Sequence, residues 1–295
     1  MNNFLSIIED ICHKLNVKLS YTSDKWVKIL EKDGKVHYIY GYKFDLNNHG
    51  IGSSVDDKGL FYDICKIKNL PIIDHFVIFK NYDQDKVIKY FHDNNNLLIV
   101  KGNVGTCGLE VFKIGDEKSL INKINELFKS QYSISLCPYY EIKNEYRTIY
   151  LNKELRIIYG KERPFIIGDG IHNIKELAIK YNDYYIENKL DNEDYVPLIN
   201  EKIFLNYQFN LSRGARMFFD IDNNLKERIM SLSNDVINKL DLNFVSVDII
   251  HTIDNKLLIM EANSGIMMNN FIRFNKDKLN DVYNLYYDAI KLMFK

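Results

Sequence analysis

Three residues near the end of the chain have the types and the spacing of a metal site. Asp248 lies in one largely apolar run, and Glu261 and Asn263 lie in the next. If Asp254 and Asn255 form a two-residue hairpin turn, Asp248 faces Glu261 with the two Cβ atoms about 4.5–5.5 Å apart. Two carboxylates that close repel each other unless a cation lies between them or one keeps a proton. Together with an amide oxygen they are hard ligands, so the hairpin predicts Mg²⁺ or Mn²⁺ that carries substrate phosphates.

The register of this hairpin decides between a metal site and a plain surface edge. Both alternatives are open from the sequence, because a solvent-facing hairpin can carry the same polar residues. A slip of one residue in the turn would move Asp248 to the other face of the sheet and separate it from Glu261.

A glycine-containing loop after an apolar strand is the second feature with a chemical meaning. Lys101 ends the run at 97–100 and is followed by Gly102, Gly105 and Gly108. Glycine lets the backbone turn its N–H groups toward phosphate oxygens, and a lysine at the end of a buried strand needs an anionic partner. The loop is neither a P-loop nor a dinucleotide fingerprint, because GK[ST] is absent and a strand follows. Alone it also fits an ordinary hairpin loop, but together with the acidic hairpin it predicts MgATP.

Composition excludes several other classes of protein. The 295 residues contain 39 Lys and Arg against 40 Asp and Glu, a net charge of −1, which argues against nucleic acid and anionic membranes as partners. No apolar stretch reaches the roughly 18–20 residues of a membrane span, and the first residues lack a secretory pattern. The four cysteines form no CxxC pair. We therefore expect a cytoplasmic protein that acts on a small molecule or a peptide.

Helices and antiparallel strands are expected to position these residues. Periodicity predicts helices at 4–15, 57–69, from 83, 117–128, 173–190, 223–240 and from 276. It predicts strands within 26–44 and at 75–79, 97–100, 109–112, 134–137, 145–150, 155–159 and 244–262. The order predicts an α+β chain whose helices pack on mainly antiparallel sheets.

Further motifs occur in order between the two features. KERP at 161–164 is followed by IGDGIHNI at 167–174, which is similar to the RxPA and GDGxHTI motifs of known ligases. NLSRGA at 210–215 resembles their NLSTGG or NLHRGG. With these motifs the chain, from about Ser53 onward, resembles the ATP-grasp superfamily of carboxylate–amine ligases. It is most similar in pattern to the central domain of cyanophycin synthetase, the ligase half of bifunctional glutathione synthetase and the ribosomal-protein glutamate ligases.

The resemblance implies a role for each motif residue. The nucleotide would be bound by two lysines, a glycine lid, a hinge strand and a ribose-binding glutamate: Lys58, Lys101, Gly105, Thr106, Gly108, Cys137, Tyr139 and Glu145. The metals would be bound by Asp248, Glu261 and Asn263. The catalytic residues would be Arg147, Arg163, Asn210 and Arg213, with Arg163 and Arg213 stabilising the transferred phosphoryl group and the tetrahedral intermediate.

Alternatives and departures accompany these roles. Glu145 and Arg147 share a strand face, so an ion pair within the strand is the alternative to their functional roles. The lid of the family reads KPxxGxxGxGV, but here Gly102 replaces the proline and Glu110 the last glycine. After Asn263 the relatives continue differently, so we expect a different acceptor side of the pocket.

The resemblance implies an α+β, ATP-grasp fold of two lobes that grip ATP. We expect a reduced N-terminal lobe at 1–70, a small lobe with the glycine lid at 71–140 and a large lobe with the metal site at 141–295. The implied reaction is ADP-forming amide synthesis through an acyl phosphate, with ATP and Mg²⁺ (or Mn²⁺) and an amino acid or peptide substrate. A kinase that uses the same site and a non-catalytic ATP-binding module are the alternatives. The oligomeric state is open, although the short leading lobe favours a homodimer that completes the pocket.

Overall fold

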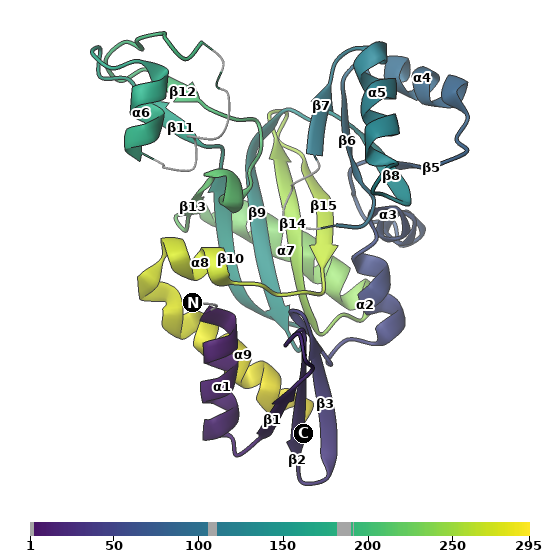
Figure 1. Cartoon of the computed structure of the whole chain (residues 1–295), viewed down its shortest axis with the longest axis vertical. Coiled ribbons are helices and arrows are strands. Elements are labelled where there is room, and N and C mark those ends of the chain that lie inside the picture. Colours follow the sequence, from purple (N-terminus) through teal and green to yellow (C-terminus); the bar gives the residue numbers. More distant parts are fainter. Residues whose placement is uncertain (1–2, 106–110, 182–189, 191) are drawn as a thin grey trace.

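The computed structural model describes residues 3–105, 111–181, 190 and 192–295. A large central sheet lies between a smaller sheet with its helices, a peripheral unit and an N-terminal unit (Figure 1). Every pairing between the named strands of the described residues is antiparallel, which confirms the predicted α+β class. No helix in the described ranges is long and apolar enough to cross a membrane.

The central sheet has the strand order β13–β10–β9–β14–β15. Its strands are β9 (Ile142–Leu151), β10 (Glu154–Glu162), β13 (Arg216–Phe218), β14 (Phe244–Thr252) and β15 (Leu257–Asn263). Asp222 is the N-cap residue of helix α7 (Asn223–Leu240), and its side chain accepts a hydrogen bond from the Leu225 amide. The helix buries Ile229, Val236 and Ile237 in the core against one face of this sheet. At one end, the opposite face packs Ile149 and Phe244 into the core formed with the N-terminal unit.

The small lobe is a four-stranded sheet in the order β5–β8–β6–β7. Its elements are β5 (Phe76–Phe79), α4 (Gln84–Asp93), β6 (Leu98–Gly102), β7 (Val111–Ile114), α5 (Glu117–Leu127) and β8 (Ser133–Pro138). Leu98, Val100 and Leu136 point into a core formed with α4 and α5. Because side chains alternate along a strand, Lys101 and its partner Ser135 lie on the opposite face.

Backbone pairing joins the small lobe to the edge of the central sheet. The amide of Ile73 donates to the carbonyl of Ile259 on β15 at 3.0 Å, and the Ile259 amide donates to Pro71 at 2.8 Å. Helix α3 (Lys58–Ile67) precedes this connection and begins at Asp57, whose side chain accepts from the Leu60 amide. These contacts fix the start of the small lobe against the strand that carries Glu261.

The N-terminal unit contains elements from both ends of the chain. These are α1 (Asn3–Lys14), β1 (Lys18–Tyr21), β2 (Val27–Lys32), β3 (Lys35–Tyr40), β4 (Lys43–Phe44), α8 (Asn269–Phe274), η3 (Lys276–Lys278) and α9 (Leu279–Met293). Helix α2 (His49–Val55) instead packs beside α3 in the core that contains α7. Phe4, Phe44 and Tyr286 pack together in the core of the N-terminal unit, so α9 lies beside α1 (Figure 1). The lobe boundaries at residues 70 and 140 stay predictions.

A peripheral unit projects from the central sheet on the side away from the small lobe (Figure 1). It consists of β11 (Phe165–Ile167), α6 (Ile174–Tyr181) and β12 (Lys202–Phe204), and a short 3₁₀ helix, η2 (Leu211–Arg213), follows. The helix predicted at 173–190 runs to Tyr181, and 182–189 lie outside the described residues. The strand predicted at 109–112 is β7, which begins at Val111, and 109–110 also lie outside them.

Candidate active site

The acidic hairpin pairs as the sequence predicts, but its turn is different. Asp248 faces Glu261, and Ser246 faces Asn263. The predicted two-residue turn is wrong, because Thr252 donates its amide to Lys256 and three residues lie between them. The additional loop residue shifts the register by one, and a β-bulge after Asp248 shifts it back. The bulge therefore restores the predicted pair.

Four charged side chains form a buried network on the face of the central sheet opposite α7. Arg147 of β9 binds Asp248 of β14 with two hydrogen bonds, from Nε at 2.8 Å and from Nη2 at 2.5 Å. Lys161 of β10 donates to Asp248 at 3.0 Å and also to Glu145 of β9. Asp248 is fully buried, and Lys161 and Glu145 are each less than a tenth exposed. Glu145 and Arg147 therefore do not form the alternative ion pair within β9. Each binds a residue on a neighbouring strand, Glu145 binding Lys161 and Arg147 binding Asp248.

Burial and ion pairing shift the pKa values of the two carboxyl groups of this network in opposite directions. Burial raises the pKa of Glu145 to about 7, although Lys161 opposes the shift. Burial also acts to raise the pKa of Asp248, but Arg147 and Lys161 together hold it at about 2. Asp248 is therefore ionised at neutral pH, and Glu145 is the carboxyl group of this network that titrates near neutral pH.

The oxygen atoms around the hairpin fit a divalent cation. The amide nitrogen of Asn263 lies 3.3 Å from Glu261 Oε1, so its carbonyl oxygen and this carboxylate lie on the same strand face. A carboxylate has about four lone-pair positions, and Arg147 and Lys161 occupy three of those on Asp248. The described residues contain no cluster of three or more His, Cys, Asp or Glu side chains that could hold a metal by themselves. The set therefore suits Mg²⁺ only with further oxygens, such as phosphate and water.

Two lysines lie opposite the strand that carries Glu261. Lys101 belongs to β6 of the small lobe, and Lys58 to helix α3, which precedes that lobe. Lys58, at the start of α3, is buried and donates to the carbonyls of Asn103 at 3.3 Å and Gly105 at 3.1 Å. Burial lowers the pKa of Lys58, while the nearby charge of Glu261 acts to raise it. Lys101 on β6 is buried as well, and no hydrogen bond or ion pair engages its ammonium within the described ranges. A buried cation without a partner is costly, so this position suits an anionic ligand.

A neutral histidine lies beside these lysines. His75 Nδ1 is 2.7 Å from Ser135 Oγ and 3.2 Å from Cys137 Sγ on β8. Burial, with the charges of Lys101 and Lys58, lowers the pKa of His75 to about 2. The ring therefore adds no charge. Cys137 is buried beside it, and its role in a hinge strand stays a prediction.

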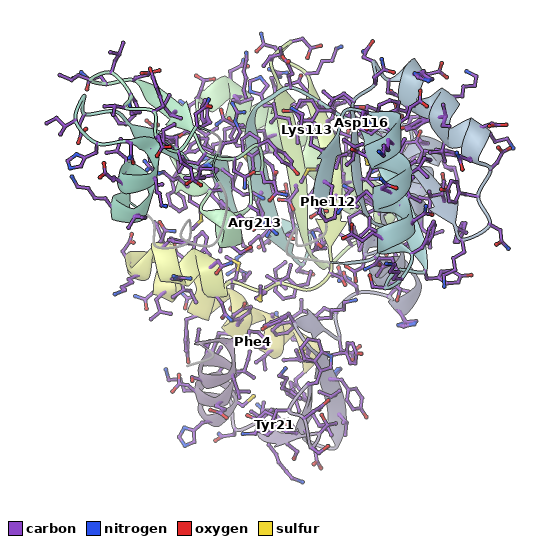
Figure 2. All side chains as sticks on the ribbon, turned by 45° about the horizontal axis from the view of Figure 1, so that its top comes forward. Phe4, Tyr21, Phe112, Lys113, Asp116 and Arg213 are labelled. Carbon is purple, nitrogen blue, oxygen red and sulfur yellow. The ribbon has the colours of Figure 1, made fainter. Side chains whose placement is uncertain are left out.

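Strand β7 contacts both the end of the hinge strand and the large lobe. The ammonium of Lys113 on β7 lies 3.9 Å from the ring centroid of Tyr139. From the large lobe, Tyr207 donates its hydroxyl to the carbonyl of Val111 on β7 at 2.9 Å, and the Gln208 amide lies 3.2 Å from the same oxygen. Lys113 and, on the large lobe, Arg213 are labelled in Figure 2. The two lobes therefore touch directly at the strand that follows the glycine loop.

The remaining predicted catalytic residues lie in the large lobe near the end of β10. Arg163 lies two residues beyond Lys161, and its guanidinium stacks on the ring of Phe204 at 4.0 Å. Asn210 caps η2 by accepting from the amide of Ser212 at 2.8 Å, and Gly214 ends that turn with φ +85°. This turn, which requires glycine's left-handed backbone, holds the half-buried Arg213.

The structure brings most of the predicted residues to facing surfaces and adds one that the sequence did not single out. Lys161 contacts both buried carboxylates, whereas the KERP motif by itself indicates no role for this lysine. Its position opposite Glu145 was the missing signal. Thr106 and Gly108 of the predicted lid lie outside the described residues. The nucleotide, metal and catalytic roles stay predictions.

Solved ligase structures share this fold. No protein-family model and no curated protein sequence matches the chain. D-alanyl-alanine synthetase A of Vibrio cholerae superposes with a TM-score of 0.59 at 11% identity, over 98% of this chain and 92% of that one. D-alanine–D-alanine ligase of Bacillus anthracis complexed with ATP gives 0.56 at 15% identity, over 83% and 69%. A bifunctional glutathione synthetase of Pasteurella multocida gives 0.52 at 14% identity, over 90% and 40%.

The likeness confirms the predicted ATP-grasp fold. This chain spans 40% of the length of the glutathione synthetase and 66% and 62% of that of two D-alanine–D-alanine ligases. At such low identity the likeness establishes the fold alone. What the chain does must therefore be argued from its own site.

Proposed function

We propose that this chain, which has the ATP-grasp fold, is an ATP-dependent ligase that joins a carboxylate to an amine and releases ADP and phosphate. The substrate class we propose is an amino acid or a peptide. A homodimer and a cytoplasmic setting stay predictions from the sequence.

The observation that carries this proposal is the opposition of two unlike surfaces. Lys58 comes from the small-lobe side, as does Lys101, which has no partner among the described residues, and Glu261 and Asn263 lie on the facing edge of the central sheet. Ser264, the residue after Asn263, donates its amide to the side chain of Asp56 at 2.9 Å, two residues before Lys58, so the two surfaces are close enough to share one ligand. A polyphosphate with a divalent cation satisfies both surfaces, because its oxygens pair with the lysines and its cation with the carboxylate.

The proposed chemistry needs charge neutralisation more than a protein nucleophile. A substrate carboxylate attacks the γ-phosphorus of ATP, the bond to the β-phosphate oxygen breaks, and ADP leaves with that electron pair. The amine then attacks the acyl carbon, loses a proton and displaces phosphate. Lys58 and Lys101 would hold the phosphates, and Arg163 and Arg213 would stabilise negative charge as it develops.

The buried network would hold this arrangement in place. Arg147 and Lys161 fix the carboxylate of Asp248 from two sides, so its remaining lone pair keeps one direction. Glu261, Asn263 and this lone pair would hold Mg²⁺. When bound, the metal would supply positive charge at the phosphate oxygens.

Substrate-dependent ADP release tests the proposal. Purified protein is incubated with MgATP and a panel of carboxylate and amine pairs, and ADP and phosphate are measured. Hydroxylamine is added in a parallel reaction, because an acyl phosphate is trapped as a hydroxamate. We expect ADP release only with a matching carboxylate, and we expect Asp248→Asn and Glu261→Gln to remove it.

Three outcomes would contradict this function. Full turnover by Asp248→Asn or Glu261→Gln would overturn the site. A stable phosphorylated product that needs no amine would identify a kinase. Tight MgATP binding without ADP release from any substrate would identify a non-catalytic nucleotide-binding module.

A further inference from the structure

Three cations and two aromatic rings alternate on the large lobe next to the proposed site. The guanidinium of Arg163 lies 4.0 Å from the Phe204 ring centroid, and the ammonium of Lys202 lies 5.2 Å from that ring. Lys202 also lies 3.9 Å from the Phe165 ring, as does the guanidinium of Arg216. We call this set, Arg163, Phe204, Lys202, Phe165 and Arg216, the cation–aromatic ladder.

Strand pairing builds the ladder from three short elements. Phe165 on β11 faces Phe204 on β12, with ring centroids 6.3 Å apart in an edge-to-face arrangement. Arg216 lies on β13 and donates to the carbonyl of Phe165 at 2.8 Å. The rings hold the cations by their faces, so the side chains are ordered before any ligand arrives.

Stacking leaves the hydrogen-bonding edge of the first arginine open. Within the part of the chain that the structure describes, the Arg163 guanidinium has an aromatic contact but no hydrogen bond or ion pair. A guanidinium covered on one face still presents its planar row of donors at the edge, which matches a carboxylate with two parallel hydrogen bonds. Arg163 is therefore arranged for an anionic partner.

The charge of the ladder is unbalanced. Glu162 pairs with Lys202 and is the carboxylate that contacts the ladder among the described residues. Three cations against one anion leave an excess of two positive charges. Lys202, Phe204 and Arg216 are exposed, so this excess faces solvent.

The ladder leads away from the buried charge network. Arg163 follows Lys161 by two residues, which is roughly 7 Å along an extended chain. Arg216 faces Glu162 across β10 and β13, so the other end of the ladder is tied to the same strand. Neighbouring strands are separated by about 4.8 Å, so the three cations span more than one carboxylate.

We propose that the cation–aromatic ladder is a docking track for an acidic peptide segment, one of whose carboxylates lies next to the proposed ligase site. Several spaced cations favour several linked carboxylates over a single small acid, and the exposed Phe204 ring favours a chain with apolar side-chain stems. The neutral charge of the whole chain disfavours nucleic acid, which binds extended basic surfaces. The track's role in catalysis rests on the proposed function, but peptide binding does not.

Binding of a labelled peptide without nucleotide tests the track. The probe is fluorescein-labelled hexaglutamate, the matched neutral probe is hexaglutamine, and the readout is fluorescence anisotropy with the full chain at low salt. We expect hexaglutamate to bind at least tenfold more tightly than hexaglutamine. Lys202→Gln and Arg216→Gln, which leave the predicted catalytic residues intact, should each weaken hexaglutamate binding by about fivefold.

Arg228→Gln is the matched control. Arg228 is exposed on α7, against the other face of the central sheet, where it donates to the carbonyl of Asn255 at 3.0 Å. Its loss should leave peptide binding unchanged, and thermal unfolding of all variants confirms that they fold. Phe204→Leu should weaken binding, because it removes the ring that holds Arg163.

The outcomes separate the track from the ligase. Equal binding of the two peptides, or binding that Lys202→Gln and Arg216→Gln leave unchanged, would overturn the track. A single-stranded oligonucleotide that binds more tightly than hexaglutamate, and loses binding in the same variants, would replace it with a nucleic-acid surface. Hexaglutamate binding in a protein that releases no ADP would support the track and contradict the ligase.

Discussion

Removing the ammonium of Lys161 should destabilise the protein far more than removing an exposed lysine. Lys161 lies between Glu145 and Asp248, and all three side chains are buried. In Lys161→Met, Asp248 keeps Arg147, but Glu145 loses the cation bonded to it. Breaking a buried ion pair by removing one partner costs about 3–5 kcal/mol, because a buried charge is left without compensation. We expect the free energy of unfolding to fall by that amount at pH 7.5.

Protonation of Glu145 should limit this loss. Burial already raises the pKa of Glu145 to about 7, so the carboxyl group takes up a proton readily once Lys161 is gone. The variant should therefore lose less stability at pH 5.5 than at pH 7.5. For the same reason, the double variant Lys161→Met with Glu145→Gln should be more stable at pH 7.5 than Lys161→Met alone.

Urea unfolding followed by far-UV circular dichroism measures these differences. The matched control is Lys153→Met, which removes an exposed ion pair with Asp241 at 2.6 Å. Exposed pairs contribute at most about 1 kcal/mol. The reasoning is refuted if the two single variants lose the same stability, or if Glu145→Gln does not rescue Lys161→Met.

Three further predictions follow from the site. Lys101→Met should raise the thermal unfolding temperature, because it removes a buried cation that has no partner in the described part of the chain. It should also abolish the stabilisation that MgATP gives to the native chain, and unchanged MgATP stabilisation would contradict it. Burial raises the pKa of Glu145, so its stabilising contribution is complete below about pH 4.5 and is lost as the pH rises through 7. The urea midpoint of native protein relative to Glu145→Gln should therefore fall from pH 5 to pH 8, and a constant difference would show that Glu145 does not titrate there. Tyr207→Phe removes the hydroxyl that donates to the Val111 carbonyl, a hydrogen bond that contributes about 1 kcal/mol. Amide hydrogen exchange should therefore accelerate at β7 but not in the central sheet. If the variant and the native protein exchange at the same rate at β7, this contact does not hold the lobes together.

The sequence predicts that Asp248 faces Glu261, but it does not predict the loop and the β-bulge that produce this pairing. The alternation of apolar residues fixes which face of β14 and β15 is buried, and this face selects the pairing. The turn assumed in the prediction has one residue fewer than the observed loop. The bulge after Asp248 compensates for that residue, and no local pattern in an apolar run indicates a bulge.

The role of Lys161 in the buried network could not be predicted, because the apolar periodicity shows neither the true end of β10 nor its β-bulge. The predicted strand ended at Tyr159, whereas β10 continues to Glu162. A second bulge, between Leu155 and Ile157, shifts the register of β10 against β9 by one residue. Without that shift Lys161 would face Asn144, and the buried network would lack its central cation. Bulges are thus what periodicity misses here, and they decide which charges meet.

Contacts between distant parts of the chain could not be predicted from the sequence, for a different reason. The short strands β1, β4, β11 and β12 are too brief to show a period of two over several residues. The contact between α1 and α9 joins residues almost a whole chain apart, and each helix shows only an apolar face without its partner. The cation–aromatic ladder arises in the same way, because β11 and β12 bring Phe165 and Phe204 together across a long insertion.

The balance of charge in the site explains why a ligand with both signs is needed. When Glu145 is ionised, its charge and those of Arg147, Lys161 and Asp248 cancel inside the large lobe, so this network leaves no net charge for a ligand. Among the predicted nucleotide and metal residues outside this network, the charged ones are Lys58 and Lys101 on one side and Glu261 on the other. An anion alone would satisfy the lysines but meet Glu261, and a cation alone would satisfy Glu261 but meet the lysines. A metal-bound polyphosphate meets both requirements at once, so nucleotide and metal should bind far more tightly together than either does alone.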